Sequence, residues 1–279
     1  MKKLIVIFTV LALLLTLAGC QKSSGSRRWD DDDDEGGLFL PGISDDAGDA
    51  DELPMPGDDD DQASELQAGS VDFEYVLVDN SIRNANGDIL VSREYYKVVL
   101  LGDDPACQSI NELIEADCQL FLNSDIGWTV EELEDVVESM YGFDALFNDA
   151  NATVVHNGNG YISIRVSEGW FMGGVCNYNS YGLTYDLTTG EEAGIEDIMG
   201  LTPEEALTQL RVLAAEGLRN YYGEEGLLVE PETGLAEYSL EDFNFYLEGG
   251  ELVLTFYTYE FACGAAGSAE IHTGIMVGE

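Results

Sequence analysis

Two stretches of the chain, residues 171–200 and 243–274, alternate apolar or aromatic residues with polar ones. This alternation has the two-residue period of a strand that buries one face. Each stretch also contains a loop of small residues, Gly173-Gly174 in the first and 264–267 in the second. Small residues let two backbones approach closely. We therefore expect the two stretches to lie side by side in one body of sheet and helices.

The rest of the folded region mixes strand and helix signals. Capping residues mark helix starts at Ser109, Thr129 and Thr202, each with Glu three residues later, and a short helix is expected over 195–199. An Asn-Gly pair at 86–87 predicts a hairpin turn. The pattern predicts an α+β fold, with a mixed or antiparallel sheet packed by three to four helices. Strands are expected at 71–78, 89–101, 152–156, 161–171, 178–187, 243–247, 251–258 and 268–277.

The N-terminal residues 1–19 have the features of an export signal. Lys2 and Lys3 precede an apolar run over 4–17, which is shorter than the roughly 20 residues that span a bilayer. The run ends in Leu-Ala-Gly before Cys20, and this ending resembles the bacterial lipobox. The resemblance implies a lipoprotein that is diacylated at Cys20 and held on the extracytoplasmic face of a bacterial membrane. An ordinary secretory signal with an incidental cysteine is the alternative.

Residues 20–70 are rich in Asp, Gly, Pro and Ser, and we expect them to form a disordered acidic tether. Their Asp runs lack the spacing of a calcium-binding loop, so a diffuse cloud of counterions is expected there. The whole chain has 55 acidic and 11 basic residues, for a formal charge of -44. Such a surface repels nucleic acid and attracts cations and basic proteins.

No motif for catalysis or for a cofactor is found in the sequence. His156 and His272 are the only histidines, and no Cys or second His stands beside either of them at metal-ligand spacing. We expect both to lie at the surface or at a sheet edge. Nucleophile elbows and phosphate loops are absent, and carboxylates are too abundant for any acid pair to stand out. We therefore expect a protein that is not an enzyme and has no cofactor or metal.

Four cysteines follow Cys20, and they allow three pairings. Cys107 and Cys118 would lie roughly 16 Å apart along a helix, which is too far for a disulfide unless Cys107 is in a loop that doubles back. Cys118 falls on the apolar side of that helix, as a buried free thiol would. Cys176 and Cys263 both lie in the small-residue loops, and we predict a disulfide between them.

Further motifs accompany these loops. A Gly-Gly-x-Cys loop at 173–176 precedes a Tyr-rich strand, an Asp-Leu-Thr-Thr-Gly turn at 186–190 precedes the short helix, and an aromatic segment at 259–267 ends in Ala-Ala-Gly. Together they resemble the extracellular C-terminal domain of the anti-sigma factor RsiV and of the deacetylase PdaC, known as domain of unknown function 3298. Residues 151–279 would form this domain. Residues 71–150 resemble, more weakly, its N-terminal companion, domain of unknown function 4163.

The chain departs from this family at two positions. Cys176 replaces a loop histidine, and Cys263-Gly264 replaces a Pro-Tyr pair. Both changes fall on the two cysteines, which fits a disulfide in place of a loop-to-loop contact. The PdaC catalytic domain has no counterpart here. The candidate binding loops are represented by Gly173, Gly174, Tyr178, Tyr259, Gly264 and Gly267.

The leading hypothesis is a non-enzymatic surface lipoprotein whose module binds something in the envelope. The RsiV resemblance implies lysozyme as one partner, and cell-wall glycan is another. The alternatives are a wall-modifying hydrolase that uses acidic residues near the Gly-Gly loop, and a surface spacer without a ligand.

Overall fold

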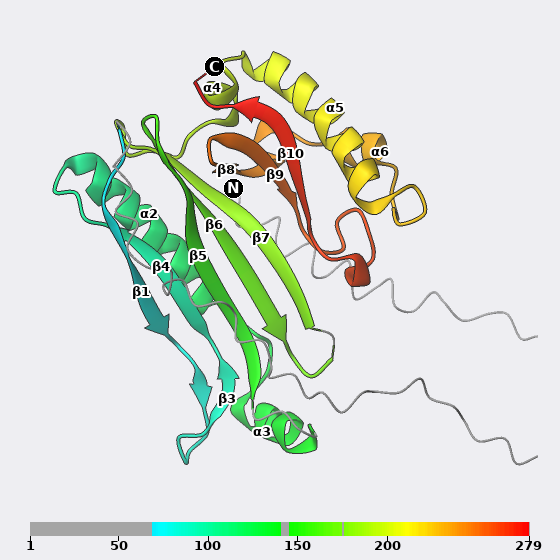
Figure 1. Ribbon diagram of the computed structural model, residues 1–279. Helices are drawn as coiled ribbons and strands as arrows, with labels where there is room; N and C mark the ends of the chain where they lie inside the picture. Colours follow the sequence, from blue (N-terminus) through cyan, green and yellow to red (C-terminus); the bar gives the residue numbers. More distant parts are fainter. Residues whose placement is uncertain (1–68, 141–144, 175, 279) are drawn as a thin grey trace, which may run out of the picture. The chain divides into compact units, whose positions relative to one another are not determined.

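The computed structural model describes residues 69–140, 145–174 and 176–278, and these all belong to one compact unit, Pro56–Glu279. The predicted signal peptide, Cys20 and all but the last two residues of the tether lie outside the described residues. The described part has two β-sheets and five α-helices (Figure 1). None of these helices is long and apolar enough to cross a membrane.

The larger sheet has seven strands. Three long strands form an antiparallel meander at its centre: β5 (Leu146–Gly158), β6 (Tyr161–Phe171) and β7 (Cys176–Asp186). On the other side of β5, β3 (Ile89–Ser92) and β4 (Glu94–Leu100) run parallel to it. The outer strands β1 (Phe73–Asp79) and β2 (Ile82–Arg83) pair antiparallel with β4 and β3.

The smaller sheet has three antiparallel strands in the order β10-β9-β8, and Figure 1 shows it beside the end of β7. Its strands are β8 (Asn244–Glu248), β9 (Glu251–Phe256) and β10 (Ala269–Met276). At Gly182 of β7 the two sheets touch through their backbones, because a Cβ built on this glycine would lie 1.7 Å from the Phe245 carbonyl oxygen. Polar groups complete the contact, since the Leu247 N–H donates to Ser163 Oγ at 2.8 Å.

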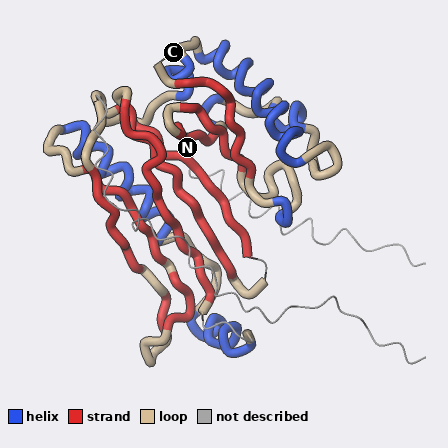
Figure 2. The backbone as a smooth tube through the Cα atoms, in the orientation of Figure 1, coloured by secondary structure: helices blue, strands red, loops and turns tan. Residues whose placement is uncertain are grey.

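Five helices cover the sheets, and Figure 2 shows them as separate blue coils around the red strands. Side chains at the N-termini set where three of the helices begin. Asp104 caps α2 by accepting from the Cys107 N–H, and Thr129 and Thr202 form capping boxes on α3 and α5. Gly200 ends α4 in a left-handed conformation. The helices are α2 (Pro105–Leu122), α3 (Val130–Ser139), α4 (Ile195–Met199), α5 (Pro203–Tyr222) and α6 (Pro231–Leu235).

In the described part of the chain, three apolar clusters lie between the helices and the sheets. The buried face of α2, with Ile110 and Ile114, packs on the large sheet against Ile164 and Val166. The buried face of α5 packs on the small sheet through residues such as Leu218 and Leu254. A third cluster joins α3 to β3 and to the start of β5. The large sheet is therefore covered by α2 and α3 over separate parts of its length.

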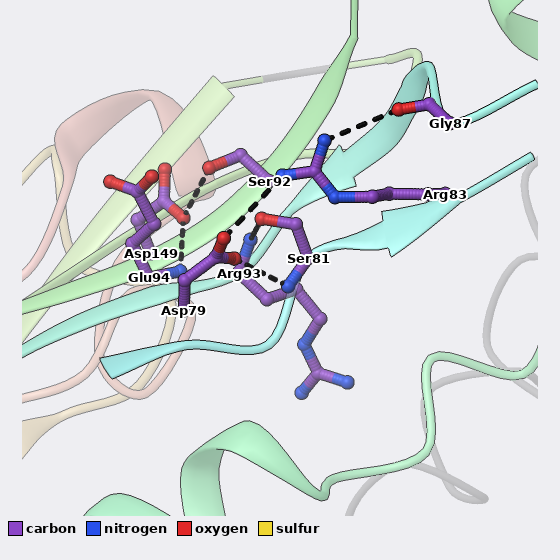
Figure 3. Close-up of polar contacts among 8 residues, drawn as sticks. All are labelled: Asp79, Ser81, Arg83, Gly87, Ser92, Arg93, Glu94 and Asp149. Atoms are coloured by element: carbon purple, nitrogen blue, oxygen red, sulfur yellow. Dashed lines mark hydrogen bonds and ion pairs between the residues drawn. The ribbon is translucent and has the colours of Figure 1, made fainter. Parts of the chain in front are cut away.

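Residue 93 interrupts what the sequence predicted as one strand over 89–101. Arg93 is 4% exposed, and its guanidinium donates to the Phe121 and Ser124 carbonyls at the end of α2. Figure 3 shows this guanidinium pointing away from the other labelled side chains. Beside it, Asp149 Oδ1 accepts from Ser92 Oγ at 2.9 Å and from the Glu94 N–H at 2.8 Å, so β5 holds the ends of both short strands (Figure 3).

The structure confirms the α+β class and corrects several details. The helix expected from Ser109 begins at Pro105, because Asp104 and Pro105 form a stronger start signal. The short helix α6 was not predicted, so the described part has five helices where three to four were expected. His156 was expected at the surface or an edge, but it is 8% exposed and its Nε2 donates to the Gly158 carbonyl at 3.0 Å. Cys118 is buried, as predicted.

The expected boundary at residue 150 falls inside β5. This strand pairs with β4 on one side and with β6 on the other. Residues on both sides of the boundary therefore contribute to the same sheet.

We expect Gly182→Ala to destabilise the protein by about 3 kcal/mol, because the new methyl group overlaps backbone that can move only if β8 shifts. The matched control is Gly174→Ala, where a Cβ would meet nothing within 4 Å. Urea unfolding of the two variants and the wild type measures the difference. Equal midpoints for both variants would show that the contact between the sheets is loose.

Candidate functional site

The two organising stretches meet at the outer edge of β7. Thr258 Oγ1 donates to the Tyr178 carbonyl at 2.9 Å, and the Thr258 N–H donates to Asn179 Oδ1 at 2.9 Å. Asn177 Nδ2 donates to Tyr259 Oη at 3.4 Å. The expectation that these stretches lie side by side is therefore confirmed, with β7 in one sheet and the turn at 257–260 leading out of the other.

Tyr259 adopts an unusual backbone conformation in this turn. Its φ is +73°, in the left-handed region that a residue with a bulky side chain rarely occupies. Its ring lies over Gly264, where a Cβ would come within 2.2 Å of ring atom Cζ. The side chain remains 48% exposed. A strained backbone that presents an aromatic ring to solvent is more typical of a binding surface than of a packing position.

Tyr178 is a second exposed aromatic residue at the same edge. It is 53% exposed, and its ring covers Gly169 on the neighbouring strand, where a Cβ would lie 2.9 Å from ring atom Cε1. Cys176 Sγ donates to its hydroxyl at 3.4 Å. Tyr178 and Tyr259 thus each rest on a glycine and present ring surface and a hydroxyl group. We call Tyr178 and Tyr259 the tyrosine edge.

The other candidate loop residues are placed differently. Gly173 packs beside α3, where a Cβ would lie 3.3 Å from Val136 Cγ1, and Gly174 is exposed in the same loop. Gly267 is held to α5, since its carbonyl accepts from Tyr222 Oη at 2.9 Å. Tyr259 lies over Gly264 and is bonded to Asn177, whereas the Tyr178 side chain lies on the opposite face of β7, because successive side chains of a strand alternate. The tyrosine edge therefore presents one ring on each side of the outer edge of β7. Gly173 and Gly267 are anchored to different helices.

The predicted disulfide between Cys176 and Cys263 is not formed. Both are free, exposed thiols, and Cys107 and Cys118 are free and buried. The two stretches approach each other through Thr258 and Tyr259, which precede Cys263 in the chain. Cys263 lies at the start of the 3-10 helix η3 (Gly264–Ala266), so the contact is made by the turn and not by the cysteine.

A group of carboxylates and tyrosines lies on the α2 side of the large sheet. Asp117 of α2 accepts hydrogen bonds from Tyr95 Oη and Tyr181 Oη, both at 2.8 Å. These bonds tie the helix to β4 and to β7. Burial raises the pKa of Asp117 despite the two hydrogen bonds, which lower it.

Glu168 is part of the same group. Strand pairing aligns Ala150 of β5, Glu168 of β6 and Asn179 of β7 in one row, so their side chains share a face. Burial, with a smaller contribution from the charge of Asp117, raises the pKa of Glu168 to about 7. Among the residues that the structure describes, no group is hydrogen-bonded or ion-paired to its carboxylate.

The turn at 257–260 adds a third carboxylate beside the tyrosine edge. Glu260 accepts from the Tyr257 N–H at 2.6 Å and from Tyr238 Oη, and burial raises its pKa. Tyr257 is 36% exposed, and burial of its hydroxyl group, with smaller contributions from the charges of Glu168 and Glu260, raises its pKa. The turn therefore links the tyrosine edge to the carboxylates. Within the described ranges, no group of three or more Cys, His, Asp or Glu side chains could hold a metal ion.

The carboxylate–tyrosine group was not predicted. Asp117 lies next to the apolar stripe of α2, and Glu168 is one acidic residue among 55 in the sequence. The available signal was the interruption of the apolar face of 161–171 by Glu168. This interruption indicates a group of polar residues only when the pairing of β6 with β5 and β7 is known, because the neighbours of Glu168 lie on those strands.

We expect the stability of the protein to depend on Glu168 above pH 5. Its pKa in the folded state is about 7, against an ordinary value near 4.5, so the folded state binds the proton more tightly and stability falls as pH rises between these values. Glu168→Gln should become more stable relative to the wild type over this range, by roughly 2 kcal/mol given its partial exposure. Thermal melts from pH 5 to 8 measure this, with the exposed Glu225→Gln as control. A constant difference across this range would contradict the raised pKa.

The sequence matches no protein-family model, and no curated protein is similar to it. Among solved structures, a member of the DUF3298 family from Bacteroides fragilis aligns with a TM-score of 0.51 and 16% identity over 76% of this chain and 96% of that one. A DUF3298 family protein from Pseudomonas aeruginosa aligns with a TM-score of 0.45 and 14% identity over 73% and 90% of the two chains. The weaker match of 71–150 to domain of unknown function 4163 stays a prediction. The likeness to the Bacteroides structure shows that this chain has the fold of the DUF3298 family, as the sequence resemblance implied.

Proposed function

We propose that the protein is a non-enzymatic lipoprotein whose folded module binds a component of the bacterial envelope through the tyrosine edge. The observation that carries this proposal is that two exposed rings flank the outer edge of β7 where the turn at 257–260 meets it, one of them on a strained backbone. Exposed tyrosines offer a large contact area and a hydroxyl group at a small cost in conformational entropy, and they are enriched among binding hot spots.

The charge of the chain supports a basic protein as the partner. The formal charge is -44, and carboxylates such as Glu168, Glu260 and Glu270 lie near the edge of β7 or in contact with that strand. This charge would steer a basic protein toward the surface and speed its association, while the tyrosines would supply specific contacts. Lysozyme is the partner that the RsiV resemblance implies. Diacylation at Cys20 would hold the module outside the cell, where such a partner occurs.

We expect Tyr178→Ala and Tyr259→Ala each to weaken lysozyme binding about tenfold, because each removes one ring from the contact surface. Isothermal titration calorimetry at low salt measures the dissociation constants. Tyr221→Ala is the matched control, since this tyrosine is 52% exposed on α5. Affinity should also fall as salt is added. If the wild type does not bind lysozyme at low salt, this partner is excluded. If all three variants bind as tightly as the wild type, the tyrosine edge is excluded.

One observation favours an alternative function. Glu168, with a pKa of about 7, lies near Asp117 and could act as the general acid of a wall-modifying hydrolase. Such an enzyme would release soluble fragments from purified peptidoglycan in the presence of a chelator, and Glu168→Gln would abolish this release. Absence of release by the wild type would contradict the alternative. A surface spacer would neither bind nor cleave in any of these assays.

A further inference from the structure

A row of polar residues crosses the meander near one end of its strands, on the α2 side of the large sheet. Strand pairing aligns Asn148 of β5 with Trp170 of β6, and Trp170 with Asn177 of β7. The next row on the same face holds Glu168 and Asn179. These two rows place an indole ring, a carboxylate and the amides of Asn148 and Asn179 on one face of the sheet, which we call the amide–indole face. The Asn177 amide at its β7 end is buried and bonded to Tyr259.

The amide–indole face lies between two helix-covered parts of the sheet. On one side of it along β5, Leu146 is fully buried and packs with Leu133 of α3. On the other side, Ala152 and Val166 are buried in the cluster under α2. Between them, Asn148 and Trp170 remain partly exposed. The Asn148–Trp170 row therefore coincides with the part of the face that neither helix seals, and the Glu168 row borders the α2 cluster, in which Ala150 is buried.

Several polar groups of this face have no partner within the described ranges. No hydrogen bond is made there by the Asn148 amide, by the Trp170 indole N–H or by the Glu168 carboxylate. Asn179 uses its carbonyl oxygen for the Thr258 N–H, and its NH₂ group donates to no protein group in the same ranges. None of these groups is among the buried unpaired side-chain atoms of the described residues, so they reach solvent and are free to bond to a ligand. A surface that gathers such donors and acceptors around an aromatic ring is suited to a polar ligand.

The combination of hydrogen-bond donors and acceptors on this face indicates which class of ligand it could bind. The Trp170 N–H and the Asn179 NH₂ can only donate, the Glu168 carboxylate can accept, and the Asn148 amide can do both. A peptide could also pair these groups through its backbone N–H and C=O groups, so the indole ring is the feature that distinguishes between ligands. Sugar hydroxyl groups donate and accept, and the C–H face of a pyranose ring packs on an indole ring. Negatively charged polymers are disfavoured by the charge of -44.

We propose that the amide–indole face binds a saccharide, with one sugar ring over Trp170 and its hydroxyl groups bonded to Asn148, Glu168 and Asn179. This inference rests on the proposed envelope-binding function and names wall glycan as a ligand class for the module. It uses a different set of side chains from the tyrosine edge. The two surfaces adjoin, because Asn177 beside Trp170 donates to Tyr259 Oη, so a glycan and a basic protein would be recognised by neighbouring but different side chains.

The test titrates the purified full-length protein with a soluble hexamer of β-1,4-linked N-acetylglucosamine and, separately, with lysozyme. We expect saturable binding of the hexamer and a shift of the Trp170 indole N–H signal in NMR spectra, which is assigned by replacing Trp29 and Trp128 with Phe. Trp170→Ala and Asn148→Ala should each weaken hexamer binding about tenfold. Trp170→Phe, which retains a ring for packing, should weaken it less, and Tyr221→Ala should leave it unchanged. Circular dichroism melts verify that each variant is folded.

The outcomes separate this inference from the proposed function. Hexamer binding that is weakened about tenfold in folded Asn148→Ala and less in Trp170→Phe supports the saccharide face, whether or not lysozyme binds. If lysozyme binds and the hexamer does not, the saccharide face is wrong and the proposed function stands. If the hexamer binds equally well to the wild type and to all folded variants, the ligand lies elsewhere on the protein. If neither ligand binds, both proposals fail.

Discussion

The backbone contact at Gly182 is the constraint on which the arrangement of the two sheets depends. A side chain at this position would collide with the Phe245 carbonyl, so β8 can reach β7 only because residue 182 is glycine. The Leu247 N–H bond to Ser163 then fixes the small sheet on β6 as well. The chain that leaves β9 then passes the edge of β7, where Thr258 bonds to Tyr178 and Asn179. This path carries the turn at 257–260 to Tyr178.

The two faces of the central meander differ in the side chains they carry, because only one of them contacts the small sheet. The face toward the small sheet is polar, with Ser163, Arg165 and Ser180, and Arg165 lies 3.8 Å from Glu270 of β10. The opposite face is apolar where α2 covers it and polar where no helix seals it. Side chains alternate along each strand, so one meander can hold the small sheet on one side and present the amide–indole face on the other.

Several groups near the proposed binding surfaces are held at an energetic cost. Tyr259 has a positive φ, and burial disfavours the charged forms of Asp117, Glu168 and Glu260. The apolar packing of α2 and α5 on the two sheets offsets this cost. Strained and unpaired groups that gather at the edge of a well-packed core are a common feature of binding sites, because the core can hold them in position.

The sequence by itself determined most of the local structure: Thr129 and Thr202 set helix starts through their own capping boxes, and the alternation of residues set the strands of both sheets. It also indicated that the two organising stretches would meet. Only the tertiary structure decided where Arg93 breaks a strand, that the four cysteines in the described residues stay unpaired, and that Trp170 lies between Asn148 and Asn177. Capping and alternation depend on neighbours within a few residues. Strand pairing and the approach of the two sheets depend on residues far apart in the chain, which no local pattern records.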